Sequence, residues 1–236
     1  MQPIKNIANK IAGLCLNEEQ KLDLLREALG SKNLDLIEAA LLKGAKPRVR
    51  EIHLRLIRDD CPLTEKEFIQ ICEVFRQFES LNKTTLDFVG EFGSKPTLIS
   101  SVIELTNYST QAIKYLISCG VEPTGIDVIT ACREKSNPKY LKALLDYGID
   151  PYTYFRESGE FAIACILFRV LKFQDLEKVK LISEYPYKGK MPIDVANILQ
   201  ELFAVAEGKV DDSQFSQEFA RVAAQYLQFL REDAMQ

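Results

Sequence analysis

The sequence contains, at residues 138–151, the stretch PKYLKALLDYGIDP, in which a short amphipathic segment ends at Gly148 and a proline follows three residues later. Two near-copies occur, LDLIEAALLKGAKP at residues 34–47 and TQAIKYLISCGVEP at residues 110–123. A glycine followed closely by a proline is typical of the end of an α-helix. A helical unit that recurs in this way cannot bury its apolar face alone and stacks on its neighbours. The repeats therefore predict an array of stacked helices.

The spacing of apolar residues extends this prediction to the whole chain. Apolar residues recur at intervals of three and four, and no segment of reasonable length alternates with a period of two. We therefore predict an all-α fold, an α-solenoid of stacked antiparallel helix pairs with helical caps. The eight-residue apolar run at 161–168 is interpreted as part of a fully buried helix. The expected helices cover residues 4–14, 18–30, 34–43, 48–58, 65–80, 85–92, 98–105, 112–118, 126–133, 139–147, 161–171, 176–184, 193–207 and 214–231.

Several helix ends carry specific signals. Asn17 with Gln20, and Thr64 with Glu67, have the spacing of a capping box, in which each residue bonds the backbone of the other. Asn33 is the expected N-cap of the first repeat, and Gly44 its left-handed terminating residue.

The chain is divided by its irregular stretches. Residues 1–187 are predicted to form the helical repeat array, which is irregular around residues 82–95. A Pro-, Gly- and Lys-containing interruption at residues 186–192 separates this array from residues 188–236. That last part is predicted to be a C-terminal helical pair, serving as a cap or a small subdomain.

The repeated pattern, xLxALLxxGxxP in outline, resembles the second helix and the following turn of the ankyrin repeat. The family's first-helix signature TPLHxA is missing, since the corresponding positions read PTLI from Pro96 and PTGI from Pro123. Gly120 and Gly148 are 28 residues apart, whereas the family period is 33. The five missing residues fall after Pro123, where an ankyrin repeat has its β-hairpin finger. The resemblance therefore implies a degenerate array without fingers, and other α-solenoid families stay open.

Composition and charge exclude some classes of protein. The 236 residues carry a net charge of −4, whereas a general nucleic-acid binder is usually basic, so no nucleic-acid partner is expected. The six cysteines form no CxxC pair and mostly occupy apolar positions of helical patterns, which favours a reducing compartment. No signal-peptide or membrane-spanning run is visible, so we predict a cytoplasmic protein, or one delivered into a host cell without a cleavable signal peptide.

A cluster of basic residues is the sharpest local feature. Lysines and arginines are concentrated between residues 43 and 58, where Arg48, Arg55 and Arg58 fall on one helical face. Such a stripe could dock an acidic peptide, a phosphate or an anionic lipid, the last by peripheral contact only, and the alternative is an ordinary solvated face. The residues predicted to bind a partner are Arg48, Arg50, Arg55, Arg58, Arg133 and Lys135.

Catalytic and metal-binding motifs are missing from the sequence. His53 is the one histidine, the cysteines are too dispersed for a structural zinc site, and no nucleotide-binding loop or nucleophile elbow is present. We predict no catalytic residue, no cofactor and no metal. The alternative is an enzyme, or an enzyme subunit, whose site is built from dispersed carboxylates or a cysteine.

The last predicted helix carries an aromatic face at four- and three-residue spacing. This face is expected to cap the array, and the alternatives are pairing with a second copy through Phe215, Phe219 and Tyr226 or entry into a groove of a partner. Taken together, the sequence predicts a non-catalytic interaction module of adaptor, inhibitor or effector type that binds another protein on its concave face. That step from fold to function rests on analogy between solenoids.

Overall fold

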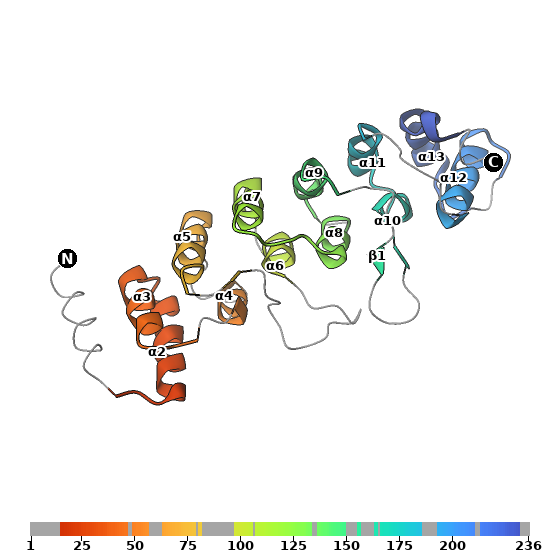
Figure 1. Cartoon of the computed structure of the whole chain (residues 1–236). Helices are drawn as coiled ribbons and strands as arrows, with labels where there is room; N and C mark the ends of the chain where they lie inside the picture. The colour runs from red at the N-terminus through yellow and green to blue at the C-terminus, as the bar shows by residue number, and fades with distance from the viewer. Residues whose placement is uncertain are drawn as a thin grey trace. The chain divides into compact units, whose positions relative to one another are not determined.

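The computed structural model describes most of the chain. The described residues are 15–46, 49–56, 63–78, 80–81, 97–105, 107–133, 136–149, 155–156, 163–164, 166–185, 193–210 and 213–231. They are almost entirely helical, which confirms the all-α class (Figure 1). Two compact units are present: unit 1 comprises residues 1–90 and 95–123, and unit 2 comprises residues 91–94 and 124–236.

Unit 1 contains six described helices in two layers. They are α2 (Glu18–Gly30), α3 (Leu34–Leu42), α4 (Val49–Leu56), α5 (Glu65–Phe75), α6 (Leu98–Leu105) and α7 (Thr110–Ser118). Helices α2, α4 and α6 pack one on the next, as do α3, α5 and α7, while α2 packs against α3 and α6 against α7 (Figure 1). We call the two sets the even-numbered layer and the odd-numbered layer.

Unit 2 repeats this arrangement. Its described helices are α8 (Gly125–Ala131), α9 (Pro138–Asp146), α10 (Ile166–Lys172), α11 (Leu176–Ser183), α12 (Ile193–Ala206) and α13 (Gln217–Tyr226), followed by the 3₁₀ turn η1 (Gln228–Leu230). Helices α8, α10 and α12 form the even-numbered layer, and α9, α11 and α13 form the odd-numbered layer (Figure 1). Helices α12 and α13 pack against each other as the last helix pair that the structure describes in this unit.

Local chemistry explains where the helices begin and end. The side chains of Asn33 and Thr64 accept from backbone N–H groups at the third position of α3 and α5, and the predicted capping boxes at Asn17 and Thr64 are both formed. Gly44, Gly120 and Gly148 follow the repeated helices with φ of +86°, +85° and +110°, a backbone region that L side chains avoid. The glycine-terminated repeat is therefore confirmed at all three copies.

Two tight turns between paired helices show a feature that the sequence did not reveal. The turn between α2 and α3 and the turn between α10 and α11 each hold a non-glycine residue in the left-handed region, Lys32 at φ +55° and Gln174 at φ +53°. In each turn the next residue, Asn33 or Asp175, then caps the following helix. Helix α2 ends at Gly30, as predicted, and Ser31 follows as its C-cap.

Other predicted boundaries are corrected. The helix expected at residues 161–171 begins only at Ile166, because Ile163–Ala164 forms β2, which pairs antiparallel with β1 (Phe155–Arg156). A short apolar run does not distinguish a strand from a buried helix, which explains the error. The last helix begins at Gln217, since Ser216 caps it, and the helix from Glu65 ends at Phe75. The helices expected at 4–14 and 85–92, and the boundary at 187/188, lie outside the described residues.

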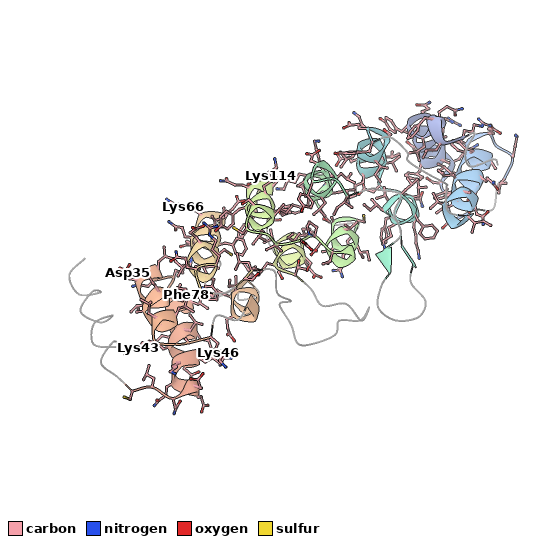
Figure 2. All side chains as sticks on the ribbon, in the orientation of Figure 1. Asp35, Lys43, Lys46, Lys66, Phe78 and Lys114 are labelled. Atoms are coloured by element: carbon pink, nitrogen blue, oxygen red, sulfur yellow. The ribbon has the colours of Figure 1, made fainter. Side chains whose placement is uncertain are left out.

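Most helices of the odd-numbered layers share one register. In α3, α7, α9, α11 and α13, the fourth and seventh residues, counted from the first helical residue, are fully buried. The fourth residues are Ile37, Ile113, Leu141, Val179 and Ala220. The seventh residues are Ala40, Leu116, Leu144, Ile182 and Ala223. The fifth residue of each is exposed. Figure 2 shows Lys66 of α5 and Lys114 of α7 on the side that faces away from α4 and α6. Each odd-numbered layer thus presents one face to its partner layer and one to solvent.

Candidate functional site

The predicted arginine stripe is only partly within the described residues. Arg55, on α4, is 4% exposed, whereas Arg133, just after α8, is exposed. Arg48, Arg58 and Lys135, and the side chain of Arg50, lie outside the described residues, as does the side chain of His53. Among the described residues, Arg55 therefore presents no exposed guanidinium to a partner, and the binding role of the stripe stays a prediction.

The burial of Arg55 follows from the position of α4 between its neighbours. Helix α4 packs against α2 and α6, and its Glu51 is 4% exposed. Arg26 of α2 donates to the Glu51 carboxylate through Nε at 3.0 Å and through Nη2 at 3.3 Å. This contact also raises the pKa of Arg26. Charge density along one segment did not reveal which of its faces would be packed.

Unit 2 presents a shallow groove, open to solvent, between α9 and α11. Its volume is about 240 Å³, and it is lined by Pro138, Lys139, Lys142, Glu177, Lys180, Leu181 and Glu184. Leu181 is 9% exposed and supplies an apolar surface, while the charged residues come from both helices. Lys139 also lies over the Tyr140 ring, 5.0 Å from its centroid.

Specific contacts fix the register of the three odd-numbered helices in unit 2. Near their C-terminal ends, Tyr185 Oη donates to Asp146 Oδ1 at 2.7 Å and joins α11 to α9. Near the N-terminal ends, the Gln174 amide accepts from Ser216 N and donates to Gln214 O, both at 3.1 Å, and joins α11 to α13. The three helices therefore run parallel, with their N-caps Asn137, Asp175 and Ser216 at one level.

This register places three cations at one level of the odd-numbered layer. Lys142, Lys180 and Arg221 are the fifth residues of α9, α11 and α13, and all three are exposed; we call them the cationic row. Lys142 pairs with Asp146 at 2.9 Å. Within the part of the chain that the structure describes, Lys180 and Arg221 have no ion-pair partner. Lys180 and Arg221 are therefore available to an external anion, and Lys142 is exposed at the same level with its ion pair to Asp146.

A second lysine of α11 has a different environment. Lys178 is fully buried, donates from Nζ to the carbonyl oxygen of Arg133 at 2.7 Å, and lies 2.8 Å from Asp175 Oδ2. Asp175 also caps α11 by accepting from Lys178 N. Because this buried ammonium group is both ion-paired and hydrogen-bonded, it joins α11 to the end of α8 and has a structural role.

A polar cluster between α5 and α7 bears on the enzyme alternative. Tyr115 Oη donates to Glu73 Oε2 at 2.5 Å, and Arg76 donates to the other oxygen of that carboxylate. Burial and this bond raise the pKa of Tyr115, and Arg76 lowers that of Glu73. Burial raises the pKa of the nearby Cys72 thiol well above its usual value, which makes it a poor nucleophile. The cluster gives no support to a catalytic cysteine.

The remaining predicted features belong to the interior. Phe215 and Phe219 are each 5% exposed and stack with their ring centroids 5.8 Å apart, and Tyr226 is half-buried. Pairing of two copies through these residues stays a prediction. Among the described residues, no group of three or more His, Cys, Asp or Glu could hold a metal ion. No described helix is both long and apolar enough for a bilayer.

The cationic row was missed because its residues are 38 and 41 positions apart in the sequence. Aligning the three glycine-terminated copies puts Glu38, Lys114 and Lys142 at the fifth position, a mixed set. Helices α11 and α13 lack the terminal glycine, so their alignment needs the caps Asp175 and Ser216. Comparison of the chain with protein-family models, curated proteins and solved structures found no match.

Proposed function

We propose that the chain is a non-catalytic protein-interaction module, an α-solenoid of stacked antiparallel helix pairs of the ankyrin type, which binds a partner protein. The partner surface is the odd-numbered layer of unit 2, including the groove between α9 and α11. The observation that carries the proposal is this groove, which is open and lined by apolar and charged side chains from successive pairs. Solenoids typically bind proteins on extended surfaces that successive repeats form together.

Two properties of the groove support a macromolecular partner. It is shallow, and its lining residues Lys139, Lys142 and Lys180 come from two neighbouring helices, whereas a small-molecule site is usually concave and largely encloses its ligand. A long side chain from a partner could also cover Leu181 while the partner's backbone stays above the groove.

The ankyrin-type interpretation is supported by the two-layer packing in each unit and by the glycine-terminated turns.

Site-specific photo-crosslinking tests the proposal. A photoreactive phenylalanine analogue is placed at Glu177 or Glu184 in the groove, and at Asn197, an exposed residue of α12, as the control. After irradiation in an extract of the source cells, mass spectrometry should identify the same polypeptide at both groove positions and not at Asn197. Equal labelling at all three positions, or none at any, would contradict binding at this groove.

A further inference from the structure

The cationic row has a geometry that restricts what can bind it. Its members lie on α9, α11 and α13, which pack side by side in one layer (Figure 1). Packed helix axes are separated by about 8–10 Å. Because Lys142, Lys180 and Arg221 occupy the same register, they form a row that crosses the helices with about that spacing.

Charges on both sides of the row limit the width of its ligand. On one side, the second residues of α11 and α13 are Glu177 and Glu218, while that of α9 is Lys139; on the other, the ninth positions of α9 and α11 are Asp146 and Glu184. At a rise of 1.5 Å per residue, these acids lie about 4.5 Å and 6 Å from the row along the helix axes. An anionic helix about 10 Å wide would cover the acids as well, while a narrow extended chain stays over the cations.

We propose that the cationic row Lys142, Lys180 and Arg221 docks an extended acidic segment of the partner protein, with a carboxylate at every third residue. The match is one of spacing and charge. A polyproline II segment rises about 3.1 Å per residue with three residues per turn, so every third side chain lies on one side, about 9 Å apart. A β-strand alternates its side chains and would turn residues i and i+3 to opposite faces. This inference rests on the proposed function, because it names the partner chemistry of the same surface.

Labelled peptides of equal composition give a direct test. One peptide carries Glu-Pro-Pro three times, and the other carries the same three glutamates together, followed by six prolines. Binding of each to the full chain is measured by fluorescence anisotropy at low and at physiological salt. The spaced peptide should bind several-fold more tightly, and its affinity should fall as salt screens the exposed charges.

Charge-matched variants locate the binding. Substituting one row residue, as in Lys180→Gln, should weaken the spaced peptide about two- to fivefold, the loss expected of one exposed ion pair. The triple variant Lys142→Gln, Lys180→Gln, Arg221→Gln should bind both peptides equally weakly. The control variant Lys46→Gln, Lys66→Gln, Lys172→Gln removes the same charge at exposed positions outside the row and should keep the preference for spacing. Circular dichroism of each variant reports whether it is folded.

Several outcomes would overturn the inference. Equal binding of the two peptides to the wild-type chain would exclude the spacing argument, and an unchanged affinity in the row variant would exclude these residues. Selective loss of binding to anionic phospholipid vesicles or RNA, with no peptide binding, would show a different ligand class. If the peptides fail while crosslinking at Glu177 and Glu184 still captures one polypeptide, the proposed function stands and only the acidic segment is wrong.

Discussion

Helices α4 and α11 both carry cations, and the two helices use them differently. In α4, Arg55 is 4% exposed, and Glu51, four residues earlier, accepts a hydrogen bond from Arg26 of α2. In α11, Lys178 is fully buried, whereas Lys180, two residues later, is exposed. The comparison shows that the position of a cation relative to the packed layers, and not the density of charge along the helix, decides whether it can meet a partner.

Lys178 illustrates this rule at one position of the repeat. The third residues of α7, α9 and α13 are Ala112, Tyr140 and Phe219, which are at most 5% exposed. The third position of these odd-numbered helices is therefore a core position, and in α11 it is filled by a lysine. A charge there requires compensation, which Asp175 and the carbonyl oxygen of Arg133 provide.

The largest effect is expected from removing the buried cation. Lys178→Met should destabilise the chain by about 2–3 kcal/mol, because the Asp175 carboxylate, 18% exposed, loses its cation and the Arg133 carbonyl keeps only Ser136 N as a donor. Urea unfolding followed by circular dichroism measures the loss. In the control Lys180→Met the exposed cation is removed from the same helix, and the change should stay within about 0.5 kcal/mol.

A double variant separates charge from packing in this result. Asp175→Asn with Lys178→Met removes the remaining carboxylate charge, while asparagine can still cap α11. It should recover about 1 kcal/mol relative to Lys178→Met alone, since capping is retained and the buried charge is gone. Equal stability of Lys178→Met and Lys180→Met would show that the buried pair does not contribute, and the contrast within α11 would fail.

A smaller effect is expected at α4. Arg26→Ala leaves the buried Glu51 carboxylate without its bidentate donor, and because Arg26 itself is half-exposed we expect a loss of about 1–2 kcal/mol. Arg76→Ala removes a pair whose partners are 48% and 44% exposed, and should cost less stability than Arg26→Ala. If the two variants lose equal stability in urea titrations, burial of Glu51 does not distinguish the two pairs.

These sites also show what could be predicted from the sequence. The caps Asn33 and Thr64 and the terminal glycines depend on neighbouring residues, and their predictions were confirmed. The strand β2 was missed because an apolar run fits two structures, and the cationic row because its register depends on contacts such as Gln174 with Ser216. Local signals thus predicted helix ends, whereas the surfaces required the packing between helices.

The smallest effect concerns a carboxylate that fixes a helix end in unit 1. Glu67 accepts from Thr64 N at 2.7 Å and from Lys32 Nζ at 3.1 Å, and these bonds lower its pKa from 4.5. A group whose pKa is lower in the folded chain contributes stability that is fully present above its unfolded pKa. That contribution is lost as the pH falls below about 4.5 and through the folded pKa.

Glu67→Gln should therefore cost stability at pH 7 and progressively less in acid, because glutamine cannot titrate. Urea titrations of the wild type and the variant at pH values from 7 to 3 measure the difference. Glu38→Gln, at an exposed position of α3, is the matched control and should show a smaller change with pH. A loss in Glu67→Gln that is the same at every pH would indicate that packing of the side chain, and not its charge, holds the start of α5 against the turn at Lys32.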